Sequence, residues 1–218
     1  AHVSEAVGES IERLTVSRID PETEIAQYKA EVLAKAGSSL DPNGRAMLEE
    51  DLRSPCTEEI AVFRAFARAV DAGKEGFVVL DTAPTGHTIL LLDAAESYHR
   101  EVLRTQGDMP EAVRSLLPRL RDPEFTRVLI VTLPEATPVH EAERLQNDLA
   151  RAKIHPFAWV INQSLLASGT RNSLLSQRGQ YEIPFIRRVA DGLASRCALI
   201  PWLPKTPTGV KGLGQLTG

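Results

Sequence analysis

The sequence predicts an α/β fold built on a parallel sheet. Short apolar runs, typical of buried strands, alternate along the chain with longer segments in which apolar residues recur at helical spacing. Two of these runs end on a polar side chain, Asp81 and Asn162. Because strands that alternate with helices are joined by right-handed crossovers, their carboxyl ends meet at one edge of the sheet, where open α/β sheets bind ligands.

The first third of the chain is helical in pattern after one short strand. Residues 14–19 alternate between apolar and polar side chains, which predicts that strand. Asp20-Pro21 and Asp41-Pro42 each supply an N-cap and a first helical residue, and they predict helices over about 21–35 and 42–52. A third helix, closed by Gly73, is predicted from the apolar spacing of Ile60, Phe63, Phe66 or Ala67, and Val70.

The rest of the chain alternates strands and helices. Residues 77–80 predict a buried strand that ends at Asp81. Further strands are predicted at 128–133, 157–161 and 197–200. Helical patterns cover 88–122, with a break near Gly107 to Pro110, and then about 139–152 and 183–194. Residues 163–180 predict a polar loop, and a tail rich in Pro and Gly follows the last strand.

The stretch after the strand at 77–80 is the most informative part of the sequence. Asp81 stands at the carboxyl end of that strand, and a small polar loop with Thr82, Pro84 and Gly86 follows it. In nucleoside triphosphatases with a phosphate-binding loop, such an Asp helps to hold Mg²⁺ and the loop after it senses the γ-phosphate. The alternative is an ordinary turn, where Asp, Thr, Pro and Gly are all common.

Composition limits the classes of protein that fit. The chain has 218 residues, 43% hydrophobic and 25% charged, which predicts one domain or slightly more. Its net charge of −4, with acidic and basic residues interspersed, argues against binding to nucleic acid. No segment approaches the ~18 apolar residues of a transmembrane helix. Two distant cysteines, Cys56 and Cys197, indicate neither a disulfide framework nor a zinc site.

Several motifs together resemble those of one family. They are Asp81-Thr82-Ala83-Pro84-Thr85-Gly86-His87-Thr88, Arg53-Ser54-Pro55-Cys56-Thr57-Glu58-Glu59, Val131-Thr132-Leu133-Pro134-Glu135 and Pro207-Thr208-Gly209. In this order they resemble the arsenical pump-driving ATPases, which energise arsenite and antimonite export. The resemblance covers essentially the whole chain and is greatest to the second of the two homologous halves of the full-length enzyme.

The resemblance implies a P-loop NTPase-like domain of the deviant phosphate-loop, dimeric-ATPase class. The sequence contains no Gly-x-x-x-x-Gly-Lys-Ser/Thr segment, since Gly73-Lys74 is followed by Glu75. In the family that loop lies upstream of the stretch that matches here, and the first residues resemble those just after a catalytic switch Asp. We therefore expect residues 1–218 to form a single incomplete ATPase domain, truncated at its N-terminus, with a helical insert at 88–125. Alone, it is expected to be inactive.

The resemblance also implies a nucleotide site for ATP and Mg²⁺. Asp81 is expected to hold Mg²⁺ through a water, and Thr82, Pro84 and Gly86 to form the switch. Asn162 ends the strand at 157–161, where a side-chain amide can read the donors and acceptors of a base. Related ATPases contact adenine with an Asn at this position. Pro204 lies in a loop that either supplies apolar contact to the base or simply connects two elements.

A metalloid site is implied at a second place. Arsenite and antimonite are soft, thiophilic centres, and Cys56 stands where a helix begins, a position that favours the thiolate. In full-length members, the corresponding Cys and Ser, with the His of the signature motif, bind metalloid between the two halves. Here these are Cys56, Ser54 and His87. The alternative for Cys56 is a buried small hydrophobe, as we expect for Cys197.

The expected function is therefore a subunit that couples Mg-ATP hydrolysis to arsenite or antimonite efflux, with the metalloid as both cargo and allosteric ligand. Its expected partners are a membrane exporter, a homologous first half or second copy, and a metallochaperone. It is expected in the cytoplasm, at the inner face of the membrane. The alternatives are a tail-anchored membrane-protein targeting ATPase and a non-hydrolysing regulatory or binding half. An iron–sulfur reductase component needs cysteines that this sequence lacks.

Overall fold

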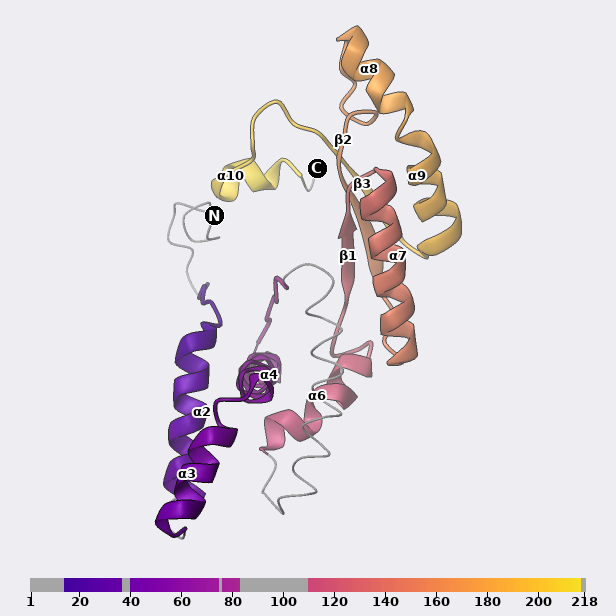
Figure 1. Cartoon of the computed structure of the whole chain (residues 1–218). Coiled ribbons are helices and arrows are strands. Elements are labelled where there is room, and N and C mark those ends of the chain that lie inside the picture. Colours follow the sequence, from indigo (N-terminus) through magenta and orange to yellow (C-terminus); the bar gives the residue numbers. More distant parts are fainter. Residues whose placement is uncertain (1–13, 37–39, 75, 83–109, 217–218) are drawn as a thin grey trace. The chain divides into compact units, whose positions relative to one another are not determined.

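The structure, a computed structural model, describes residues 14–36, 40–74, 76–82 and 110–216 (Figure 1). The chain divides into two compact units. The helical unit comprises Arg18–Asp122, and the sheet unit comprises Ala1–Ser17 together with Pro123–Gly218. That residues 1–218 form a single incomplete ATPase domain with an insert at 88–125 stays a prediction.

The sheet unit contains three parallel strands in the order β1-β2-β3. They are β1 (Leu129–Thr132), β2 (Ala158–Ser164) and β3 (Cys197–Pro201), so the strands expected at 128–133, 157–161 and 197–200 are confirmed. Trp159 on the central strand is paired with Ile130 of β1 and Cys197 of β3. The predicted α/β fold with a parallel sheet is therefore confirmed.

Helices cover one face of this sheet. In α7 (Ala136–Arg151), Gln146 accepts a hydrogen bond from the Trp159 indole at 2.7 Å. The same side chain donates at 3.2 Å to the carbonyl of Leu193, which ends the π-helix η2 (Arg188–Leu193). On the opposite face Leu129 and Val131 are 54% and 61% exposed. The β1 strand is thus buried on one face only, where burial on both was expected.

Shorter helices connect and follow the strands. The loop expected at 163–180 is wrong in its second part, because α8 (Ser173–Gln180) begins there with Asn172 as its N-cap. The helix expected at 183–194 is formed by α9 (Ile183–Arg187) and η2 together. The tail contains a further short helix, α10 (Gly209–Gly214). No helix within the described ranges is long and apolar enough to cross a membrane.

The helical unit contains an apolar cluster that is formed by two of its helices, α4 (Pro55–Asp71) and α6 (Glu111–Arg121). The other elements of the unit are α2 (Pro21–Ala36), α3 (Pro42–Asp51) and the 3₁₀ turn η1 (Ala72–Lys74). The cluster is Phe63, Ala67, Val70, Val113 and Leu116. It contains three of the residues whose spacing predicted the third helix. The expected N-caps also form, since Asp41 accepts from the Gly44 amide at 2.7 Å and Asp20 from the Thr23 amide at 3.4 Å.

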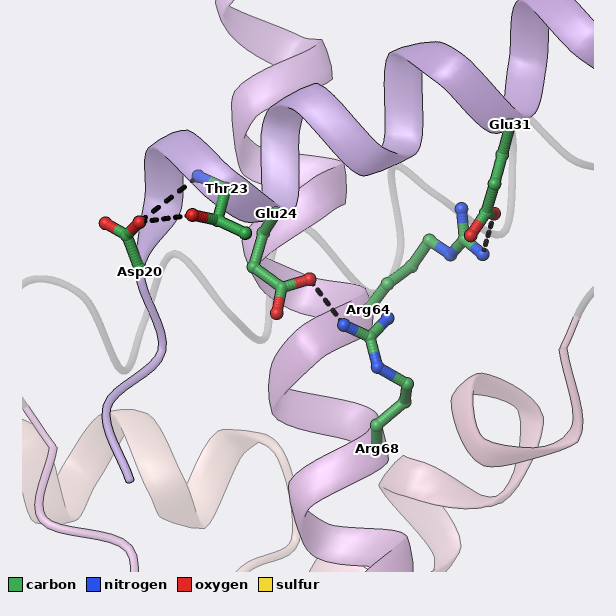
Figure 2. Close-up of polar contacts among 6 residues, drawn as sticks. All are labelled: Asp20, Thr23, Glu24, Glu31, Arg64 and Arg68. Atoms are coloured by element: carbon green, nitrogen blue, oxygen red, sulfur yellow. Dashed lines mark hydrogen bonds and ion pairs between the residues drawn. The ribbon is translucent and has the colours of Figure 1, made fainter. Parts of the chain in front are cut away.

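Two arginines of α4 tie α2 to it, as Figure 2 shows. Arg64 donates to Glu31 at 2.7 Å, and Arg68 pairs with Glu24. The hydrogen bond from the Arg64 guanidinium lowers the pKa of the Glu31 carboxyl. These pairs lie at least partly in solvent, so each stabilises the packing of α2 on α4 only modestly.

Two predicted strands are wrong. Residues 14–19 and 77–80 have no regular secondary structure, and Phe77 and Val79 are 93% and 76% exposed. A strand exists only when a neighbouring backbone pairs its N–H and C=O groups, and no described residue does so for either segment. Of the helical pattern at 88–122, the structure describes only its end, as α6. Residues 83–109 lie outside the described residues.

Candidate functional site

The carboxyl end of β2 carries the clearest site-forming geometry. The ladder between β2 and β3 shifts register between Ile161 and Ser164, which makes Asn162 and Gln163 a bulge. Gln163 has a φ of 58°, a left-handed conformation that is uncommon outside glycine. A bulge changes the direction of the side chains beside it, so the Asn162 side chain points in a different direction from the one it would have in a regularly paired strand.

The hydrogen bond of Asn162 fixes which way its amide faces. Its Oδ1 accepts from the Gln163 backbone amide at 3.0 Å. Since a backbone N–H can only donate, the oxygen must take this place and the NH₂ group faces elsewhere. The residue is half-buried. An amide held in this way can donate to an acceptor nitrogen of a base, and its oxygen keeps a second lone pair for an exocyclic amino group.

The loop after β3 is joined to the same bulge. The Trp202 amide donates to the Ser164 carbonyl at 2.9 Å. Pro204, two residues further on, is exposed, and the Trp202 side chain is 42% exposed. The structure therefore brings the ends of β2 and β3, which carry the two residues expected at the base, to one edge of the sheet. Trp202, an exposed aromatic at this edge, was not among the expected site residues.

A buried carboxylate behind the bulge was also missed. Glu182 is 7% exposed and accepts from the Ser164 hydroxyl at 2.7 Å. It accepts also from the Leu165 and Leu166 amides, at 3.0 and 3.2 Å. The sequence offers no signal for this contact, because the partners are separated by 16 to 18 positions across a segment that reads as a polar loop. Only the fold brings them together.

The residues expected at the γ-phosphate are described only in part. Asp81 and Thr82 are exposed, and they follow residues 77–80, which form no strand. Pro84 and Gly86 lie outside the described residues, and so does His87, which was expected at the metalloid site. The roles expected for these five residues therefore stay predictions.

The expected metalloid ligands stand at the start of α4, in the helical unit. Ser54 is the N-cap residue, and its hydroxyl lies 3.3 Å from that of Thr57. Cys56 is exposed, so the alternative of a buried Cys is wrong for this thiol. Cys197 was expected in the core but is exposed at the start of the edge strand β3. Partial desolvation of its thiol nevertheless raises its pKa. Over the described ranges, no cluster of three or more His, Cys, Asp or Glu is placed to hold a metal ion.

A parallel α/β fold with polar residues at the carboxyl edge of its sheet defines a class of ligand-binding proteins in which nucleotide-binding enzymes are common. Comparison with known sequences gives the family. The profile of the anion-transporting ATPases matches residues 2–116 and 91–218, so the chain belongs to that family. The family has the P-loop NTPase fold, in agreement with the parallel sheet.

Individual relatives agree with this assignment. The chain is 52% identical over 218 residues to an arsenical pump-driving ATPase of Escherichia coli and 50% identical over 216 residues to one of Acidiphilium multivorum. These alignments cover 100% and 99% of the chain and 37% of each relative. An ATPase ASNA1 homolog of Paramecium tetraurelia is 27% identical over 241 residues, covering 94% of the chain and 72% of that protein. The chain thus spans little more than a third of the length of its first two relatives.

Proposed function

We propose that this chain is part of an ATPase that couples Mg-ATP hydrolysis to arsenite or antimonite efflux through a membrane exporter. The observation that carries the proposal is the identity of 50–52% to two arsenical pump-driving ATPases over essentially the whole chain. The carboxyl edge of the sheet supports it, because Asn162 presents a fixed amide there and the loop with Pro204 adjoins it. We assign adenine recognition to this edge.

Hydrolysis is assigned to the segment that starts at Asp81. Asp81 holds Mg²⁺ through a water, while Thr82, Pro84 and Gly86 form the switch that responds to the γ-phosphate. A phosphate-binding loop is also required, because backbone N–H groups and a Lys must surround the phosphates. Residues 1–218 contain no such motif. We therefore propose that hydrolysis needs a loop from outside this stretch, and that the 218 residues alone do not turn over ATP.

Metalloid binding is assigned to Cys56, Ser54 and His87. Cys56 is an exposed thiol at the start of a 17-residue helix, so a thiophilic centre can reach it. Three-coordinate metalloid prefers more than one sulfur, so a homologous half or a second copy supplies the rest. His87 follows Asp81 by six positions in the sequence, within the same motif, and metalloid bound there affects hydrolysis through linkage. A metallochaperone is a further proposed partner, nucleic acid is not, and the proposed location is the cytoplasmic face of the membrane.

The test is ATP hydrolysis by the full-length protein encoded by the gene that carries this sequence, measured with and without antimonite. We expect antimonite to stimulate the wild type and Cys197→Ser, but not Cys56→Ser. His87→Ala should also reduce the stimulation. Equal rates with and without antimonite in the wild type would reject the metalloid function and favour a tail-anchored protein targeting ATPase or a non-hydrolysing module.

A further inference from the structure

The Glu182 carboxylate is an unusual feature of the sheet unit. Among the described residues it is the one charged residue that counts as buried. Its two oxygens receive three hydrogen bonds from the segment just after β2: one from the Ser164 hydroxyl and two from the Leu165 and Leu166 amides. Burying a carboxylate is unfavourable unless donors surround it, so these contacts hold the charge and the segment in one arrangement.

Ser164 extends this arrangement to the neighbouring backbone. Its hydroxyl donates to Glu182 and accepts from the Ala167 amide at 3.1 Å, while its carbonyl accepts from the Trp202 amide. Ser164 is completely buried. The residue therefore joins the loop after β2, the carboxylate on the α9 side and the loop after β3. Loss of one hydrogen bond in such a network weakens the others, because each partner then gains freedom to move.

Asn162 lies between this anchor and the regular ladder. Ile161, on one side, is buried and paired with both neighbouring strands, and Ser164 on the other side is held by Glu182. Between them Gln163 keeps its left-handed conformation, which persists only when the structure on both sides determines it. The direction of the Asn162 amide therefore depends on the hydrogen bonds of Glu182. None of the contacts described for Glu182 is with Asn162 itself, so this dependence is indirect.

We infer that Glu182 is a positioning residue for nucleotide-base selectivity: through Ser164 and the two amides, it fixes the bulge that aims Asn162 at an adenine base. This role rests on the proposed function. Asn162 makes the contact, and Glu182 determines where the Asn162 amide lies. An amide offering both a donor and an acceptor suits the N7 and amino group of adenine, whereas guanine presents a carbonyl in place of that amino group. Loss of Glu182 should therefore reduce the preference for adenine over guanine.

The experiment compares four forms of the full-length protein encoded by the gene: wild type, Asn162→Ala, Glu182→Gln and the control Glu141→Gln. Glu141 is a partly exposed carboxylate on α7 paired with Arg144, so its variant makes the same charge change away from the bulge. Gln at 182 keeps the size but places an NH₂ donor against backbone or hydroxyl donors. Dissociation constants for Mg-ATP and Mg-GTP are measured by calorimetry. In parallel, hydrogen exchange of the Leu165 and Leu166 amides is followed in the same four full-length proteins.

We expect Glu182→Gln to weaken Mg-ATP binding about tenfold, to change Mg-GTP binding less, and to speed exchange at both amides. Glu141→Gln should match the wild type. If Asn162→Ala binds Mg-ATP as the wild type does, the assigned base site is wrong and so is the proposed role. If Asn162→Ala weakens binding but Glu182→Gln leaves the ATP-to-GTP ratio unchanged, only the positioning role is refuted. Should Glu182→Gln not fold, Ser164→Ala, which removes one of the three donors, is judged by the same ratio.

Discussion

A close approach between α8 and the loop after β2 gives a sharp test of this part of the structure. Gly179 in α8 is buried, and a Cβ added there would lie 2.8 Å from the Leu166 amide nitrogen and 3.1 Å from its Cα. Both atoms belong to backbone that Glu182 also holds, so they cannot move aside cheaply. Gly192 in η2 is a natural control, because a Cβ there meets no atom within 4 Å.

Both Gly→Ala variants gain the same stability from a less flexible unfolded backbone, but only Gly179→Ala brings its new Cβ too close to another part of the chain. Replacing a helical Gly with Ala contributes about 0.5–1 kcal/mol of stability in each. Overpacking at position 179 costs about 1–3 kcal/mol, so Gly179→Ala should be less stable than Gly192→Ala by roughly that amount. With a urea m-value of about 2 kcal/mol/M, this difference moves the unfolding midpoint by about 0.5–1.5 M.

Tryptophan fluorescence can measure this difference in the 218-residue chain. The chain has two tryptophans, Trp159 and Trp202, and both belong to the sheet unit, as do both glycines. The signal therefore follows the unit that contains the substitutions. Equal midpoints for the two variants, or a higher one for Gly179→Ala, would contradict the close approach and with it the arrangement of the loop that Glu182 holds.

Three further predictions concern other parts of the molecule. Phe63→Ala should destabilise the helical unit by about 3–5 kcal/mol in urea titrations followed by circular dichroism, whereas Met47→Ala, at a site 70% exposed, should stay within about 0.5 kcal/mol. The pKa of Glu31 is lowered in the folded protein, so its ionised carboxylate stabilises the fold above its unfolded-state pKa, and this stabilisation is lost as the pH falls through its folded-state pKa. Glu31→Gln should therefore flatten the decline in stability below about pH 4.5. Both thiols should react with a thiol reagent in the native chain. Because the pKa of Cys197 is raised, its reaction should be slow near neutral pH and become faster at higher pH, and an unreactive Cys197 would contradict its exposure at the start of β3.

Local signals in the sequence predicted the elements that depend on local chemistry. The Asp-Pro pairs that open α2 and α3 act within one turn of the chain, and their capping bonds form as expected. The spacing that predicted α4 also identified its buried face, with Phe63 and Val70 in the core. For the same reason the apolar runs of β1, β2 and β3 were sufficient to predict a parallel sheet.

The predictions that were wrong concern residues whose structure depends on partners far away in the sequence, which a local pattern cannot reveal. Residues 77–80 have a strand's composition, but a strand needs a neighbouring backbone. The polar helix α8 has the composition of a loop, and its Asn172 cap is no stronger a signal than many turn residues. Cys197 has the apolar neighbours of a core residue, yet it starts an edge strand. Glu182 was missed because its burial depends on donors more than 15 positions away.

The position of the Glu182 network also limits which kinetic constant it can affect. Its contacts hold the bulge with Asn162 and the loop that begins at Trp202, and none of the contacts described involves Asp81 or Thr82. A base contact is made equally in the ground state and in the transition state of phosphoryl transfer, so its loss raises KM and leaves kcat nearly unchanged. Variants of Asp81 should do the reverse, because charge on the transferring phosphoryl group is stabilised through Mg²⁺. If Glu182→Gln lowered kcat as strongly as it raised KM for Mg-ATP, its role would lie in the chemical step rather than in recognition of the base.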